Sequence, residues 1–303
     1  MNKMPLICYE SYGDATHPCI ILISGIGSQL IHWPEKFIQG LTEKGFYVVA
    51  FDNRDTGLSA HYDHLVTPNL TEVINARQQG NSFQPPYTLE DMAVDVIGLM
   101  EQLQIEQAHL LGISMGGMIA QLVAVEYPDR ILSLICIATT SGDPGLPPAQ
   151  PEVLNYLLSP KRQAEDLESY ISDKIHLYKI YNHPEHWDEI KAQELYRKSY
   201  HRAHKPSGFS RQLLAIICSE PRTKKLAQLQ LPCLIIHGDY DPVFPVEHGQ
   251  QLAKCLLNSQ LVIIKKMGHG LPEHYCDKII SLIETFIINS VQDAAILYHT
   301  NAF

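Results

Sequence analysis

Short apolar runs alternate along the chain with segments in which apolar residues recur every three or four positions. Such runs are typical of buried parallel strands, and the wider spacing is typical of helices that cover a sheet. This alternation predicts an α/β fold with a mostly parallel central sheet flanked by helices. The predicted strands are 19–24, 46–52, 109–113, 131–138, 233–237 and 260–265, and the predicted helices are 34–44, 89–103, 115–127, 246–257 and 272–288.

The alternation stops between residues 141 and 224. This segment opens with a loop rich in Gly and Pro, and most of the rest has helical spacing and many aromatic residues. Because predicted strands precede and follow the segment, we expect a helical cap inserted between two strands of one sheet. The predicted domains are therefore a core of residues 1–140 and 225–303 and a cap of residues 141–224.

A Gly-x-Ser-x-Gly motif stands where a predicted strand gives way to a predicted helix. Ser114 falls at this turn, between Gly112 and Gly116. A serine on a tight strand-to-helix turn is presented to substrate, and the helix N-terminus favours negative charge beside it. The bare motif arises by chance in about one chain of this length in ten. The flanking strand and helix therefore carry the inference that Ser114 is a nucleophile.

A serine hydroxyl needs a histidine base whose tautomer is held by a carboxylate. Asp241 and His269 each follow a predicted strand, so we expect both at the same sheet edge as Ser114. The chain order of serine, acid and histidine is the one found with this type of turn. Asp239 is the alternative acid, but it directly ends its strand and suits a turn better.

Acyl transfer also needs two N–H donors for the oxyanion. We expect Met115, the residue after the nucleophile, to supply one of them. Ile26 is the candidate for the other, because the stretch Ser24-Gly25-Ile26-Gly27 allows the main chain to turn back toward the serine. The alternative interpretation of this stretch is a plain glycine-rich turn before a helix.

Several stretches match the pattern of one known group of enzymes: Asp52–Ser59, Gly112–Gly117, Asp241-Pro242, His248-Gly249 and Met267–Pro272. In these motifs the chain resembles the α/β-hydrolase superfamily and, within it, the branch of aclacinomycin methylesterase. The resemblance covers roughly residues 5–140 and 225–290. It implies that Ser114, Asp241 and His269 form a catalytic triad. It also implies that the N–H groups of Ile26 and Met115 form the oxyanion hole.

The stretch Asp52–Ser59 follows a predicted strand and contains Arg54 and Asp55 side by side. We interpret it as a hydrogen-bonded, salt-bridged loop beside the site. Direct contact of Arg54 and Asp55 with substrate is the alternative.

Charge and composition exclude several other functions. The formal net charge is −10, which argues against a surface that binds nucleic acid. Neither a secretory leader nor an apolar stretch of about 18 residues is present, so we expect a cytoplasmic protein without membrane insertion. The 7 cysteines are dispersed and the 15 histidines lack metal-binding spacing, so we expect no bound metal. We expect a monomer or homodimer.

The expected function is hydrolysis of a small-molecule carboxylic ester through an acyl-enzyme intermediate, with no cofactor. Aromatic residues are dense in the cap, which suits an ester of small to medium size with an apolar or aromatic group, although these rings equally suit packing of the cap onto the sheet. Residues 141–224 carry 12 Lys or Arg against 11 Asp or Glu, so nearly all net negative charge lies on the core, which hints at tolerance for acidic substrates.

Three alternatives use the same fold. A peptidase of the proline-iminopeptidase type needs carboxylates in the cap to bind a free amino terminus. A cofactor-free haloperoxidase or perhydrolase would use the same triad, and a ligand-binding receptor would keep the fold without turnover. The cap carboxylates available for a peptidase are Glu185, Asp188, Glu189 and Glu194.

Overall fold

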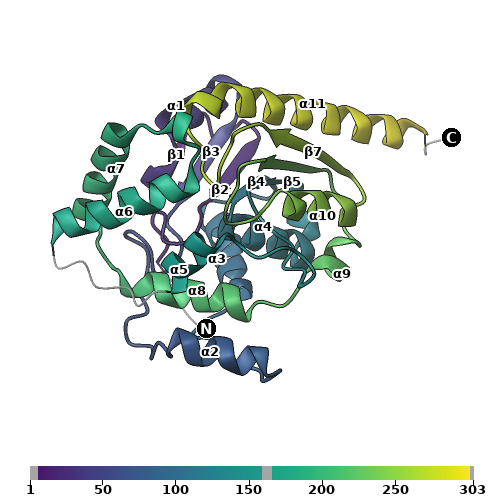
Figure 1. The fold of residues 1–303 in the computed structure, drawn as a ribbon. Coiled ribbons are helices and arrows are strands. Elements are labelled where there is room, and N and C mark those ends of the chain that lie inside the picture. Colours follow the sequence, from purple (N-terminus) through teal and green to yellow (C-terminus); the bar gives the residue numbers. More distant parts are fainter. Residues whose placement is uncertain (1–5, 159–165, 301–303) are drawn as a thin grey trace.

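A 7-stranded sheet runs through the computed structural model, which describes residues 6–158 and 166–300 (Figure 1). The strands lie in the order β1-β3-β2-β4-β5-β6-β7. Strand β1 is antiparallel to β3, and all other neighbouring pairs are parallel. The prediction of a mostly parallel sheet is confirmed. The strands are β1 (Tyr9–Tyr12), β2 (Cys19–Ile23), β3 (Tyr47–Phe51), β4 (Ala108–Ile113), β5 (Ile131–Ile137), β6 (Cys233–Gly238) and β7 (Ser259–Ile264).

Helices cover both faces of this sheet. One apolar core joins helices α1 and α11 to one face, and a second core joins α3, α4 and α10 to the other. Burial on both faces explains why every residue of β2 and of β6 is buried. The helices are α1 (Glu35–Glu43), α2 (Leu70–Gln78), α3 (Leu89–Gln102), α4 (Met115–Glu126), α5 (Pro151–Leu158), α6 (Leu167–Tyr181), α7 (Glu189–Arg202), α8 (Ser207–Cys218), α9 (Thr223–Leu226), α10 (Glu247–Cys255) and α11 (Cys276–Thr300), with short 3₁₀ turns at Leu30–His32, Pro128–Arg130, Pro184–His186 and Glu273–Tyr275.

Helix α2 lies in a stretch where the sequence pattern predicts no helix. Its start is stabilised by Asn69, whose side chain accepts hydrogen bonds from the N–H groups of Thr71 and Glu72. Among the residues of α2 whose burial is described, only Val73 is buried. Because the helix has almost no apolar stripe, the periodicity of its sequence does not reveal it.

Helices α5 to α9 follow β5 and precede β6 in the chain. Helices α6 and α7 lie side by side and share a small apolar cluster of their own (Figure 1). Ala215 of α8 and Leu226 of α9 instead belong to one of the two cores of the sheet. The division of the chain into a core and a cap at residues 141 and 224 stays a prediction.

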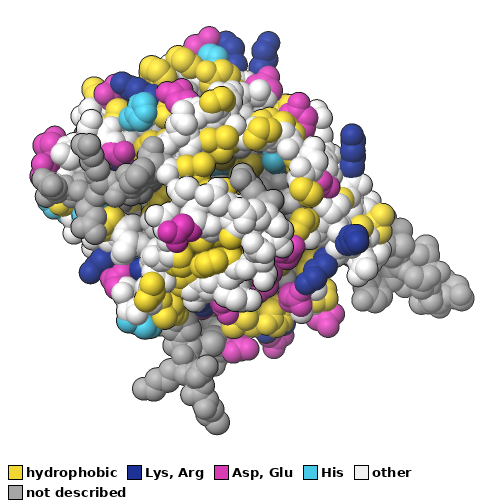
Figure 2. Space-filling view, turned by 60° about the horizontal axis from the view of Figure 1, so that its bottom comes forward, with side chains coloured by type: hydrophobic (Ala, Val, Ile, Leu, Met, Phe, Trp, Pro, Cys, Tyr) yellow, Lys and Arg dark blue, Asp and Glu magenta, His cyan; other side chains and the backbone are white. Residues whose placement is uncertain are grey.

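One face of the molecule is seen in Figure 2. Acidic and basic side chains are scattered over it among hydrophobic and other residues, and Lys and Arg form no large patch among the described residues of this face. Of the helices in the described part of the chain, none combines the length and the apolar character that crossing a bilayer demands.

Candidate active site

Ser114 lies on the turn between β4 and α4 with φ 56° and ψ −123°, a conformation that costs energy for any residue with a side chain. Hydrogen bonds hold the turn to the neighbouring strand: Ser114 N–H donates to Ile137 O at 3.0 Å, and Thr139 Oγ1 donates to Ser114 O at 2.7 Å. A Cβ atom at Gly112 or at Gly116 would overlap neighbouring backbone. Both glycines of the motif are therefore required by close packing around the serine.

The structure brings His269 and Asp241 to this serine. His269 Nε2 lies 2.8 Å from Ser114 Oγ, and His269 Nδ1 lies 2.9 Å from Asp241 Oδ2. The carboxylate at Nδ1 favours the tautomer in which Nδ1–H donates to Asp241 and Nε2 accepts from the serine hydroxyl. Asp241 and His269 are both buried, so their hydrogen bonds are shielded from water.

The two candidate acids differ in their surroundings. Asp241 Oδ1 accepts hydrogen bonds from the N–H groups of Val243 and Phe244, both at 2.9 Å, which aim its carboxylate at the histidine. Asp239 is exposed, and its Oδ1 accepts from Lys266 N–H at 2.6 Å. Asp239 therefore stabilises a turn, as its place directly after the strand indicates, and lies outside the hydrogen-bonded chain.

His237 is a residue near the site that sequence reasoning missed. It is fully buried in β6, and its Nε2–H donates to Phe244 O at 2.7 Å while lying 3.5 Å from Asp241 Oδ2. Burial lowers the pKa of His237, although the nearby Asp241 carboxylate partly opposes this. A neutral His237 thus supports the loop that carries Asp241. The sequence feature that could have indicated this role is the position of His237 at a strand end, two residues before an Asp-x-Asp pair.

The predicted oxyanion donors flank the serine on different elements. Met115 is the first residue of α4, where a backbone N–H has no acceptor within its own helix. Gly25 packs directly on the serine, because a Cβ built on it would lie 3.3 Å from Ser114 Cβ. Ile26 lines the same cavity as Ser114, and Gly27 N–H donates to Gln212 Oε1 at 2.8 Å, which anchors this loop to α8.

A cavity of about 250 Å³ opens at the serine. Helix α6 closes one side of it: Tyr181 O accepts the N–H of His269 at 2.9 Å, and the two rings meet edge to face with centroids 5.2 Å apart. The lining is mainly apolar and aromatic and includes Trp33, Tyr196 and Leu271. Within the described residues, no group of His, Cys, Asp or Glu is arranged to hold a metal ion.

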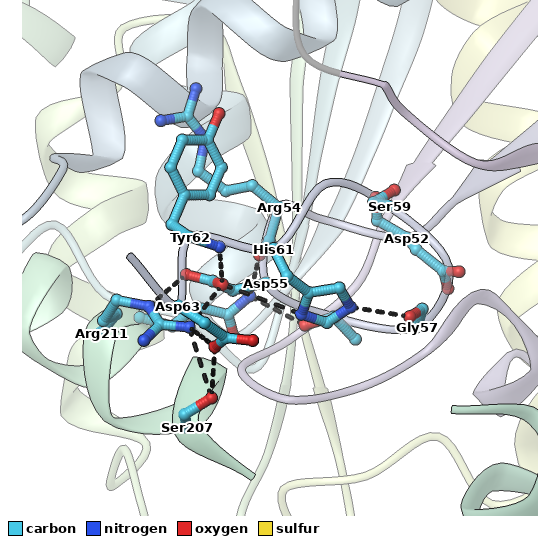
Figure 3. Close-up of polar contacts among 12 residues, drawn as sticks. Asp52, Arg54, Asp55, Gly57, Ser59, His61, Tyr62, Asp63, Ser207 and Arg211 are labelled. Atoms are coloured by element: carbon cyan, nitrogen blue, oxygen red, sulfur yellow. Dashed lines mark hydrogen bonds and ion pairs between the residues drawn. The ribbon is translucent and has the colours of Figure 1, made fainter. Parts of the chain in front are cut away.

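The loop Asp52–Ser59 forms the salt-bridged junction that we interpreted from its sequence (Figure 3). Arg54 pairs with Asp95 of α3 at 2.6 Å. Asp55 lies between Tyr62 N–H and the guanidinium of Arg211 on α8, at 2.8 and 2.7 Å. Both partners of the Asp55 pair are almost completely buried. Its charged groups are therefore used to join the loop to neighbouring helices.

A family model described as the alpha/beta hydrolase fold matches residues 18–273 of the chain. The chain belongs to the α/β-hydrolase family. Rhodomycin D methylesterase of Streptomyces peucetius is 26% identical to this α/β hydrolase over 286 residues, which cover 87% of the chain and 88% of the relative. The 3-oxoadipate enol-lactonase 2 of Acinetobacter baylyi is 25% identical over 260 residues, covering 85% and 84% of the two chains.

Solved structures agree with this α/β-hydrolase fold. The enol-lactonase of Burkholderia xenovorans superposes with a TM-score of 0.72 at 20% identity, covering 94% of this chain and 98% of that one. These comparisons confirm the predicted resemblance to an α/β hydrolase of the methylesterase branch.

Proposed function

We propose that this α/β hydrolase cleaves carboxylic esters through an acyl-enzyme intermediate, with Ser114 as nucleophile, His269 as base and Asp241 as the orienting acid. The observation that supports this most directly is the chain of hydrogen bonds from Ser114 Oγ through His269 to Asp241, at 2.8 and 2.9 Å. It begins at the wall of a cavity large enough for a small ester. Two relatives are named as a methylesterase and an enol-lactonase, both of which act on ester bonds.

In the first step, His269 Nε2 takes the proton of Ser114 as its Oγ forms a bond to the ester carbonyl carbon. Asp241 stabilises the imidazolium that results. The N–H groups of Ile26 and Met115 donate to the carbonyl oxygen as it becomes an oxyanion. When the tetrahedral intermediate collapses, the C–O bond to the alcohol breaks and His269 returns its proton to the leaving alcohol.

In the second step, His269 takes a proton from a water molecule, and the water oxygen attacks the acyl carbon. The same N–H groups stabilise the second oxyanion. The bond to Ser114 Oγ then breaks, and His269 gives its proton back to the serine. The products are one carboxylic acid and one alcohol.

Most of the carboxylates that follow α6 are already paired or capping, which favours ester hydrolysis over the peptidase alternative. Glu185 pairs with Lys266 at 2.6 Å, and Glu189 pairs with Lys179 at 2.7 Å. Asp188 caps the start of α7, and Glu194 lies within that helix. None of these carboxylates is among the described residues that line the serine cavity, where a free amino terminus would have to bind.

We further propose that residues 141–224 act as the cap that shapes this cavity.

The proposed function is tested with p-nitrophenyl esters of short alkanoic acids and with a fluorophosphonate probe. We expect the wild-type protein to release p-nitrophenol and to be labelled at Ser114, as read by mass spectrometry of the tryptic peptide. Absence of both turnover and labelling in folded protein would contradict an esterase and favour a receptor. Preferential cleavage of amino-terminal amides would favour the peptidase.

Replacing Gly25 by Ala is expected to lower kcat for ester hydrolysis about tenfold, because small displacements of reacting groups are costly. The new Cβ would lie 3.3 Å from Ser114 Cβ and 3.9 Å from Oγ, so the serine or the proposed oxyanion loop must shift. Gly45→Ala is the control away from the site, because no atom lies within 4 Å of its Cβ position; its φ of +80°, which Gly25 does not share, makes it a test of backbone strain without contact with the serine. Equal kcat for wild type and Gly25→Ala would argue against an oxyanion role for this loop.

A further inference from the structure

Lys174 lies where two cavities meet. The inner cavity of about 250 Å³ contains Ser114, and an outer cavity of about 790 Å³ adjoins it beside α6 and α8. Lys174 lines both of them, as Gly27 and Phe209 do. One face of α6 forms a wall of the inner cavity, which is lined at positions i, i+3, i+4 and i+7 by Lys174, Leu177, Tyr178 and Tyr181.

Among the residues that the structure describes, the ammonium group of Lys174 has no carboxylate partner. Among residues 6–158 and 166–300, no Asp or Glu oxygen comes within the 4.0 Å of an ion pair. The neighbouring Asp173 instead accepts the hydroxyl of Tyr156 at 2.5 Å. Lys174 Nζ lies 5.7 Å from the ring centroids of both Tyr170 and Phe209. By contrast, Lys179 on the same helix is paired with Glu189.

The surroundings of Lys174 leave its charge uncompensated. Lys174 is half-buried, and burial lowers its pKa, although Asp173 partly opposes this. His32 lines the inner cavity, and burial, together with Lys174 and Arg202, lowers the pKa of His32 to about 4, so His32 is neutral near pH 7. The charge of Arg202 is matched by Asp52 at 2.7 Å. A partly desolvated ammonium without a counterion is stabilised when an anion binds beside it.

We propose that Lys174 binds an anionic group, a carboxylate, on the substrate whose ester bond is cleaved at Ser114. This inference rests on the proposed esterase function and names its substrate class: esters that also carry a free carboxylate. Lys174 stands seven residues before Tyr181, whose ring contacts His269, so about 10 Å of helix separates them. The carboxylate and the scissile ester therefore belong several bonds apart in one substrate.

The charge of the outer cavity sets a limit on where this carboxylate binds. The charged residues that line the outer cavity are Asp55, Glu152 and Asp173 against Lys174 and Lys205, so carboxylates outnumber cations there and disfavour an anion. Tyr178, Tyr181 and Tyr196 line the inner cavity and carry no charge near pH 7. The carboxylate is accordingly expected at the junction, on the side of Lys174 that faces Ser114.

The test compares two matched sets of p-nitrophenyl esters. One set carries a terminal carboxylate, in half-esters of dicarboxylic acids of about five to about ten carbons that span the ~10 Å separation. The other set ends in a methyl group at the same chain length. We expect the wild type to favour the carboxylate set in kcat/KM by about tenfold at one chain length, which corresponds to about 1.4 kcal/mol.

Lys174→Met is expected to bring this ratio to about one, chiefly by raising KM for the carboxylate esters, whereas Lys174→Arg keeps the preference. Lys179→Met is the matched control on the same helix, and its ratio should equal that of the wild type. A wild type without preference at any chain length would overturn the proposal for Lys174 while leaving the esterase function intact. The same holds if Lys174→Met lowers kcat/KM for both sets equally. Failure of folded wild type to cleave either set would contradict the esterase function itself.

Discussion

Ser114→Ala is expected to lower kcat for p-nitrophenyl ester hydrolysis by about 10³-fold or more, and His269→Ala is expected to do the same. Without the Oγ atom no acyl-enzyme forms, and without the imidazole the hydroxyl keeps its proton. The double variant should be no slower than either single variant, because the two groups act as a unit. Steady-state kinetics with active-site titration of the wild type measures each loss.

Folding of these variants provides the control for the loss of activity. Alanine keeps the Cβ of Ser114, so the strained turn at φ 56° and its backbone hydrogen bonds to Ile137 and Thr139 remain. We expect the melting temperature of Ser114→Ala to differ from that of the wild type by only a few degrees. Asp239→Asn is the control for the acid, since Asp239 lies outside the hydrogen-bonded chain. Full activity of Ser114→Ala would contradict the mechanism.

Arg211→Met is expected to lower the free energy of unfolding by about 3 to 5 kcal/mol at pH 7, because it leaves a buried carboxylate without its cation. Arg211 donates to Asp55 Oδ1 and to Asp63 Oδ1, both at 2.7 Å, and its side chain is 2% exposed. Burial alone would raise the pKa of Asp55, but Arg211 and the N–H of Tyr62 outweigh it and hold the pKa below its ordinary value. Urea denaturation at pH 7 measures the difference.

The pH dependence separates this explanation from a simple loss of packing. A carboxylate with a lowered folded-state pKa contributes stability above its unfolded value near 4, and this contribution is lost as the pH falls through the folded-state value. In Arg211→Met, protonation of the unpaired Asp55 removes the buried charge and stabilises the folded state. The variant's loss of unfolding free energy relative to the wild type should therefore shrink between pH 7 and pH 4. Lys225→Met breaks the exposed pair with Glu126 and should cost less than about 1 kcal/mol. A deficit independent of pH would contradict the role of Asp55.

The strained turn at Ser114 illustrates how far local sequence reaches. An apolar strand, two glycines and a helix with apolar spacing are local features, and they were enough to predict the turn. The start of α3 is a local arrangement of the same kind, where Thr88 and Asp91, three residues apart, form reciprocal hydrogen bonds. The sequence pattern did not predict helix α2, because a helix with almost no apolar stripe leaves no periodic signal.

Contacts between segments far apart in the chain leave no pattern in the local sequence. The loop of His269 is held from α6 by Tyr181 O, and the loop of Asp55 is held from α8 by Arg211. Burial of His237 below Asp241 depends on helix α10, because Gly249 packs directly against the His237 ring. Each partner lies far along the chain or on another element, so no window of sequence contains the pair.

By itself the sequence determined the class of fold, the mostly parallel sheet and the serine turn, because strand and helix periodicity and the steric needs of glycine act over a few residues. Only the tertiary structure decided that His237 is buried 3.5 Å from Asp241, and that Lys174 has no carboxylate counterion among the described residues at the junction of two cavities. Those outcomes depend on which side chains meet across the fold and on how far burial shields their charges and hydrogen bonds from water.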